Sequence, residues 1–170
     1  MNQIAPLPQD EVLDSAARAH QLVAGEPLGD KEIAVLLRLS TTKLMHMLSQ
    51  RLEPYGLNSN SYIGLMMLLG TSRQCLNPSE LASMIGETRA NMTRICDDLV
   101  KRGFIQRLPD PQDRRRVNLS LSDAGRALIT ALQPQSKIHI ERTFEIFDQA
   151  EKTQLARLLS RLNRHLDSLL

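Results

Sequence analysis

The stretch from Asn77 to Gly125 limits the possible folds most, because it predicts two short helices, a tight turn and a β-hairpin in that order. Asn77 can cap the first helix, and Pro78 occupies a position where no backbone N–H is needed. Glu80 can bond back to the backbone of the cap, which completes a capping box. Gly86 is a natural end for this helix, because glycine readily adopts the left-handed conformation found there.

A second amphipathic helix follows after only two residues. Thr88 can cap it and Gly103 ends it. Its apolar stripe consists of Met92, Ile95, Cys96 and Leu99. Two short helices joined by a glycine-containing turn are typical of the helix-turn-helix, whose second helix enters the DNA major groove.

The opposite face of the second helix has polar residues suited to DNA. Arg can bond bidentately to guanine and Asn to adenine, whereas Thr can contact a phosphate or a thymine methyl. These side chains, near the helix start, are Arg89, Asn91, Thr93 and Arg94. The alternative is an ordinary solvated face, which most amphipathic helices possess.

Two short strands are predicted next, at residues 104–108 and 116–121, with a Pro- and Asp-rich turn between them. The tip of this hairpin contains Arg114, Arg115 and Arg116. Arginine is favoured in the negative potential of a narrow minor groove, so the hairpin is predicted to be a DNA-contacting wing. Asp113 is expected to pair with a wing arginine and hold the loop's shape. The alternative is a charged loop that only improves solubility.

The run Asp113-Arg114-Arg115-Arg116-Val117-Asn118-Leu119-Ser120-Leu121-Ser122-Asp123-Ala124-Gly125 closely resembles the wing signature of MarR-type transcriptional regulators. Ser122 replaces the usual Thr, and either hydroxyl can cap the next helix. The segments 78–82 and 88–94 resemble the two DNA-binding helices of the family, in particular of its multidrug-efflux repressor branch, and this adds Ser79 and Thr88 to the expected DNA contacts. The resemblance covers roughly residues 30–170 and is specific over 77–125.

Three further helices are predicted before this centre, over residues 9–24, 30–52 and 59–69, and Asp30 is expected to cap the second of the three. After the centre, Ser122 is expected to cap a long helix that is broken or kinked near Pro134. On the helix over residues 30–52, the side chains expected to face inward are Ile33, Leu37, Leu44 and Leu48. The resulting fold is mainly α with a small β-hairpin wing. It has a winged helix-turn-helix DNA-binding lobe at 54–121, N-terminal helices at 1–53 that contribute to dimerisation, and C-terminal dimerisation helices at 122–170.

The last helix has leucines at helical spacing: Leu155, Leu158, Leu159, Leu162, Leu166 and Leu169. They can pack inside their own subunit, as most apolar faces do, or against a second copy. We favour a homodimer, because two-fold symmetry matches a palindromic operator and C₂ assemblies are the commonest. The resemblance implies dimerisation through the terminal helices as well.

Charge and cysteine content agree with a DNA-binding protein of the bacterial cytoplasm. The net charge is only +2, but residues 88–116 hold eight Arg or Lys against four Asp. Two cysteines without a pairing pattern suit a reducing compartment. No signal peptide is expected, and the longest apolar stretch, Ile63 to Leu69, is far too short to span a membrane.

The resemblance also implies a small aromatic or lipophilic effector, bound between the dimerisation helices and the DNA-binding lobe. In this chain the expected lining is Met45, His46, Ser49, Tyr62 and Met66. Methionine adapts to varied apolar ligands, and His or Tyr can add a polar contact. The alternative is that Met45, Tyr62 and Met66 simply fill the core.

No catalytic motif, cofactor site or metal site is predicted. The four histidines are scattered without metal-ligand spacing, Cys96 lies on an apolar stripe, and Cys75 has no neighbour that would activate it. The sequence therefore predicts a dimeric winged-helix repressor of an efflux or stress operon. The alternatives are an architectural DNA-binding protein without an effector and a winged-helix module for protein contacts.

Overall fold

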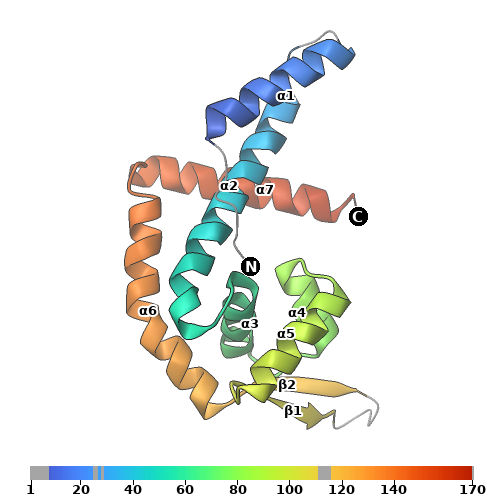
Figure 1. Ribbon diagram of the computed structural model, residues 1–170, viewed down its shortest axis with the longest axis vertical. Helices are drawn as coiled ribbons and strands as arrows, with labels where there is room; N and C mark the ends of the chain where they lie inside the picture. Colours follow the sequence, from blue (N-terminus) through green and yellow to red (C-terminus); the bar gives the residue numbers. More distant parts are fainter. Residues whose placement is uncertain (1–7, 25–26, 28, 111–115, 170) are drawn as a thin grey trace. The chain divides into compact units, whose positions relative to one another are not determined.

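The computed structural model describes residues 8–24, 27, 29–110 and 116–169 (Figure 1). The chain divides into two compact units, Met1–Gly125 and Arg126–Leu170. None of the helices in the described part of the chain combines the length and apolar character that a membrane span requires.

The first unit holds most of the helices and the hairpin. In order, its elements are α1 (Gln9–Ala24), α2 (Asp30–Leu52), the 3₁₀ turn η1 (Glu53–Tyr55), α3 (Ser59–Gly70), α4 (Pro78–Ile85), α5 (Arg89–Lys101), β1 (Ile105–Pro109) and β2 (Val117–Leu121). Helix α1 packs on α2, α2 on α3, and α4 on α5, while α5 also contacts β1. The predicted helix-turn-helix and hairpin are both confirmed.

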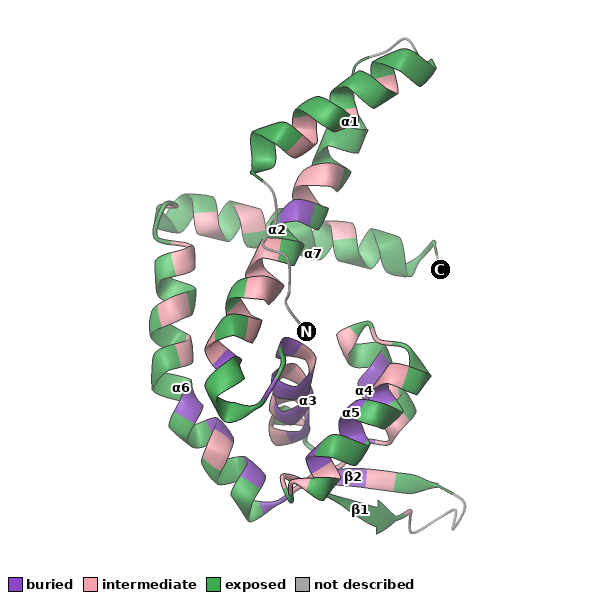
Figure 2. Ribbon diagram, in the orientation of Figure 1, coloured by how far each residue is buried: buried purple, intermediate pink, exposed green. Residues whose placement is uncertain are grey.

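The core of this unit lies where α3, α4, α5 and the hairpin meet (Figure 2). Its largest fully buried side chains are Leu65, Leu68, Leu81, Met92, Leu99, Ile105 and Leu119. Strand β1 pairs antiparallel with β2, with Ile105 opposite Leu121. On the other side of β2, Leu76 and Leu119 exchange two backbone hydrogen bonds of 3.0 and 2.8 Å. Strand β2 is therefore tied both to β1 and to the segment that leads into α4.

Two sequence-based expectations for α2 are wrong. Gly29, with a φ of 53°, occupies the cap position, and Asp30 is the first helical residue and makes no cap bond. Ile33, expected to face inward, is 57% exposed, whereas Leu39 is buried. The reason is that α2 contacts α1 as well as α3, so its buried positions do not follow one continuous stripe.

Polar contacts at Ser122 and a close backbone approach at Gly125 fix the junction after the wing. Ser122 Oγ donates to the Gly103 carbonyl at 2.6 Å and accepts from the Gly125 backbone N–H at 3.0 Å, which confirms it as a helix cap. The Ser122 N–H donates to the Phe104 carbonyl at 3.1 Å. A Cβ on Gly125 would collide with that carbonyl and stand 2.9 Å from Leu121 Cδ1. The spacing of serine and glycine in the motif therefore follows from this crowded junction.

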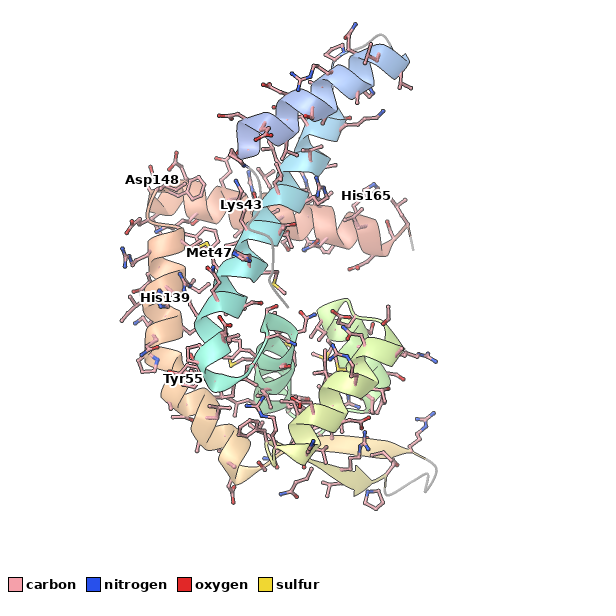
Figure 3. The ribbon with its side chains drawn as sticks, in the orientation of Figure 1. Lys43, Met47, Tyr55, His139, Asp148 and His165 are labelled. Atoms are coloured by element: carbon pink, nitrogen blue, oxygen red, sulfur yellow. The ribbon has the colours of Figure 1, made fainter. Side chains whose placement is uncertain are left out.

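Helices α6 (Asp123–Thr143) and α7 (Gln149–Asp167) complete the chain. Helix α6 runs through Pro134, so of the two expected effects, a break or a kink, the break is wrong: proline removes one N–H, but its fixed φ is compatible with a helix. The kink stays a prediction. Asp148, labelled in Figure 3, caps α7 in a capping box with Glu151, with bonds of 2.9 and 2.8 Å. The predicted leucines of α7 remain partly exposed in the single chain, and none of the helix's residues is buried.

The junction generates the first testable prediction. Gly125→Ala should lower the free energy of unfolding by about 1–3 kcal/mol or more, because the new methyl overlaps backbone that cannot move aside easily. Gly70→Ala is the matched control: apart from its chain neighbours and the backbone of its own helix, no atom lies within 4 Å of its Cβ position, and alanine favours a helix by roughly 0.5–1 kcal/mol. Chemical denaturation of both variants tests this. Equal stability of wild type and Gly125→Ala would contradict the crowding.

Candidate nucleic-acid interface

The orientation of α5 is set by its buried face. Met92, Ile95, Cys96 and Leu99 are all at most 3% exposed, as the stripe predicted. Arg89, Thr93 and Arg94 are exposed on the remaining surface, and Asn91 is half-buried. Thr88 caps the helix by accepting from the Asn91 N–H at 3.2 Å, as expected. The four predicted base- or phosphate-contacting side chains thus lie at the N-terminal part of α5, off the core.

One hydrogen-bonded chain links α3 to the polar face of α5. Glu87 Oε1 accepts from Asn60 Nδ2, and Glu87 Oε2 accepts from Asn91 Nδ2 at 2.7 Å. Asn91 Oδ1 in turn accepts from Arg94 Nη2 at 2.9 Å. The sequence pattern singles out Asn91 and Arg94 but not Glu87 or Asn60. The contact between Glu87 and Asn91 could have been predicted, because residues four apart are neighbours on a helix. Asn60 lies 27 residues before Glu87, and no local sequence pattern predicts that contact.

Thr93 and Arg89 form a second, shorter arrangement. Thr93 Oγ1 donates to the Arg89 carbonyl oxygen at 2.9 Å. The threonine hydroxyl donor is therefore used within the helix, while its oxygen can still accept. Because a phosphate only accepts hydrogen bonds, Thr93 is better placed for a methyl contact than for a phosphate bond in this rotamer.

The start of α4 and the base of the wing share one surface cleft. It has a volume of about 340 Å³ and is lined by Asn77, Pro78, Ser79, Arg116 and Val117. The structure thus brings together Ser79 and Arg116, two predicted DNA contacts from separate elements. Asp113, Arg114 and Arg115 lie outside the described residues, so their predicted roles stay predictions.

A carboxylate beside this cleft is held in its charged form. Glu80 Oε2 accepts from the Asn77 backbone N–H and Glu80 Oε1 from Arg73 Nη2, both at 2.9 Å. The bond from Asn77 and then the bond from Arg73 hold the pKa of Glu80 below its usual value, and the positive charge of Arg116 adds to this. Arg73, which the sequence pattern does not single out, therefore neutralises a negative charge next to the predicted interface.

Part of the positive charge in residues 88–116 serves the fold rather than a partner. Arg102 donates to the carbonyls of Tyr55 and Gly56, both at 2.6 Å, and its guanidinium lies 4.8 Å from the Phe104 ring centre. Arg107 pairs with Asp97 at 2.5 Å. Counting charge along the sequence therefore overstates the number of cations that face DNA.

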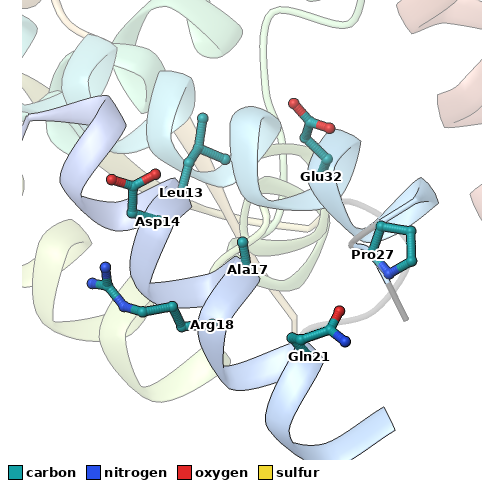
Figure 4. A pocket seen from close by; sticks show the side chains of 7 residues that line it. All are labelled: Leu13, Asp14, Ala17, Arg18, Gln21, Pro27 and Glu32. Carbon is teal, nitrogen blue, oxygen red and sulfur yellow. The ribbon is translucent and has the colours of Figure 1, made fainter. Parts of the chain in front are cut away.

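The five predicted effector residues lie on two helices that pack together. Met45, His46 and Ser49 are on α2, and Tyr62 and Met66 are on α3. All are half-buried except Tyr62, which is buried, and Ser49 Oγ accepts from the Ser59 N–H at 3.4 Å. A separate cleft of about 490 Å³ lies between α1 and the start of α2, lined among others by Ala17 and Glu32, and includes none of the five (Figure 4). The effector assignment stays a prediction.

The two cysteines differ in environment. Cys96 is fully buried, as its place on the apolar stripe predicted, and burial raises the pKa of its thiol to about 11. Cys75 is half-buried. Within the described ranges, no three His, Cys, Asp or Glu side chains are grouped to hold a metal ion.

Comparison with known proteins places these features in a family context. The model of the MarR family matches residues 59–117. The transcriptional repressor MprA of Escherichia coli K12 is 30% identical over 128 residues, which cover 75% of this chain and 73% of MprA, as expected for the efflux-repressor branch.

Two crystal structures share the fold. A probable transcriptional regulator from Pseudomonas aeruginosa is 28% identical with a TM-score of 0.69, covering 78% of this chain and 98% of that one. A mutant MarR from E. coli complexed with operator DNA has a TM-score of 0.69 at 23% identity, covering 84% and 96%, respectively. At that identity the second match concerns the fold alone.

Proposed function

The chain belongs to the MarR family of transcriptional regulators, and on this basis we propose that it is a ligand-responsive repressor of an efflux or stress operon. The observation that supports this most directly is the polar N-terminal part of α5, which is turned away from the core by burial of the opposite face. A helix of this kind, preceded by α4 and followed by a hairpin, is suited to the major groove. The same fold occurs in a mutant MarR complexed with operator DNA.

We assign the DNA contacts to two groups of residues in the lobe at 54–121. Residues of α5 and its cap contact bases and nearby phosphates, and residues of α4 and the wing contact the backbone or minor groove. The first group is Thr88, Arg89, Asn91, Thr93 and Arg94, and the second is Ser79, Arg114, Arg115 and Arg116. Asp113 shapes the wing.

The repressor acts as a homodimer on a palindromic operator, with dimerisation through residues 1–53 and 122–170. The partly exposed leucines of α7 support this: Leu158, Leu159 and Leu166 are 40%, 36% and 44% exposed in the single chain. A second copy of α7 would remove this apolar surface from water, which is favourable in proportion to the area buried. Two-fold symmetry then places one α5 in each half-site.

The effector is a small aromatic or lipophilic molecule bound near Met45, His46, Ser49, Tyr62 and Met66. Support comes from their place on α2 and α3, which pack together, while α3 also contacts α4 and α5. A ligand that shifts α3 can therefore shift the DNA-binding helices. The protein regulates by binding, without catalysis, and acts where its operator lies, in the bacterial cytoplasm.

Arg94→Ala is the first test of this function. Selection from randomised duplexes by the wild-type protein should yield a preferred palindrome, and the variant should lose about 1–3 kcal/mol of preference at one base pair of each half-site. Arg38→Ala removes the same charge from an exposed position of α2 and should keep the preference. Fluorescence anisotropy at several salt concentrations gives the affinities. Wild-type binding to all duplexes alike would indicate an architectural protein, and no binding a protein-interaction module.

The dimer is tested by charges in the leucine face. Leu159→Glu with Leu162→Glu should dissociate the protein or unfold it, because an unpaired charge in an apolar interface is costly. Thr153→Glu with Ser160→Glu places two charges on the opposite face of α7 and should leave the dimer intact. Sedimentation velocity distinguishes the species. A wild-type monomer at micromolar concentration that still binds its operator fully would contradict the dimer.

The effector site is tested with a panel of planar phenolic weak acids. We expect some of them to weaken operator binding up to a hundredfold, which requires about 2.7 kcal/mol of coupling. Met66→Trp should blunt the response by filling the site, while ligand-free DNA binding stays nearly unchanged. Met47→Trp, at an exposed position of α2, is the control (Figure 3). A normal response of Met66→Trp would contradict the site.

A further inference from the structure

The hydrogen-bonded chain from Asn60 through Glu87 and Asn91 to Arg94, here called the Glu87 network, has a fixed direction. A carboxylate accepts hydrogen bonds and cannot donate them, so both amides that meet Glu87 must present their NH₂ groups. Asn60 Nδ2 meets Oε1, and Asn91 Nδ2 meets Oε2 at 2.7 Å. The carbonyl end of Asn91 is therefore left facing away from Glu87, toward Arg94.

Only this orientation of the Asn91 amide lets Asn91 accept a hydrogen bond from Arg94. Arg94 Nη2 donates to Asn91 Oδ1 at 2.9 Å, and a guanidinium has donors only. If the Asn91 amide were reversed, its NH₂ would meet the Arg94 donors, and its oxygen would meet the Glu87 carboxylate. The charge of Glu87 thus determines, through Asn91, where an acceptor for Arg94 is found.

Asn91 is consequently poorly suited to contact a base itself. Bidentate pairing with adenine needs both the oxygen and the NH₂ of an asparagine. One N–H of Asn91 is donated to Glu87, its oxygen already accepts from Arg94, and Asn91 is half-buried. Rotating the Asn91 amide away from its present partners to reach an adenine would break the bonds to Glu87 and Arg94 and leave a carboxylate oxygen without this partner.

Arg94 is in the opposite situation. It is exposed, and only one of its five N–H donors is used by Asn91. The remaining donors can bond to O6 and N7 of guanine, the commonest specific contact of arginine. Because the side chain is already held in place, less conformational freedom is lost when it binds.

We propose that Glu87 and Asn91 are positioning residues that hold Arg94 to contact a guanine, so that Asn91 contacts no base of its own. The proposal rests on the proposed function and refines it: it removes Asn91 from the residues that contact bases, and it names the base and the side chain that determine specificity. Asn60 belongs to the same network and connects it to α3.

The test compares preferences at each base pair of the selected half-site. Arg94→Ala should reduce preference for one G·C pair by roughly five- to 150-fold. Asn91→Ala and Glu87→Gln should reduce preference at that same pair by about two- to twelvefold, the value of one hydrogen bond. In the Arg94→Ala background, Glu87→Gln should cause no further loss, because its effect is transmitted through Arg94.

Asp97→Asn is the matched control for charge. It also converts a carboxylate of the α5 region to an amide, at an exposed position that pairs with Arg107 instead of Arg94. Removing one negative charge should raise the affinity of either variant for every duplex. Only Glu87→Gln should also change the ratio of the affinities for two duplexes that differ at the G·C pair contacted by Arg94. Asn60→Ala removes the other partner of Glu87 and should also weaken preference at the same G·C pair. It is therefore a second, independent test of the Glu87 network.

Three outcomes would overturn the proposal. If Asn91→Ala relaxed a different base pair from Arg94→Ala, Asn91 would contact a base of its own. If the losses from Glu87→Gln and Arg94→Ala were additive, Glu87 would not act through Arg94. If the wild-type protein bound all duplexes equally, the proposed function itself would fail and the positioning role with it, a result distinct from the first two.

Discussion

Burial of one face of α5 is the interaction on which the rest of the DNA-binding lobe depends. Removing an Ile, Leu or Met side chain from water contributes about 1.5–3 kcal/mol, and Met92, Ile95 and Leu99 are all buried together. An exposed ion pair such as Arg73–Glu80 contributes about 0–1 kcal/mol. Apolar contact therefore sets the rotation of α5, and the polar network is built on a face whose direction is already determined.

The sequence predicts well those features that depend on neighbours along the chain. The capping box at Asn77, the left-handed glycine at Gly86 and the stripe of α5 all follow from local spacing, and all are confirmed. The expectations that are wrong concern features that are determined by packing between helices or by backbone geometry. The burial of Leu39 instead of Ile33 depends on which helices meet α2, and helix α6 tolerates Pro134.

The least predictable features join distant segments. Asn60 meets Glu87 across 27 residues, and Arg102 reaches the Gly56 carbonyl across 46. Neither pair has a spacing that a helix or hairpin would impose. The count of basic residues near α5 likewise overstates the positive charge that is available to a partner. In the sequence, Arg102 and Arg107 cannot be distinguished from arginines that face a partner. Only the fold separates cations that stabilise the lobe from those available to DNA.

The unequal environments of the two thiols have a practical consequence. Alkylating dyes react with the thiolate, and the Cys96 thiol, with a pKa of about 11 and no exposed surface, stays protonated at neutral pH. Cys75 is half-buried and lies two residues before Asn77, which caps α4. Of the two thiols, only Cys75 therefore has exposed surface at which a fluorophore could be attached, and it lies close to the start of the helix-turn-helix. A dye attached there would place an optical reporter beside α4, at a single position and without any engineered cysteine.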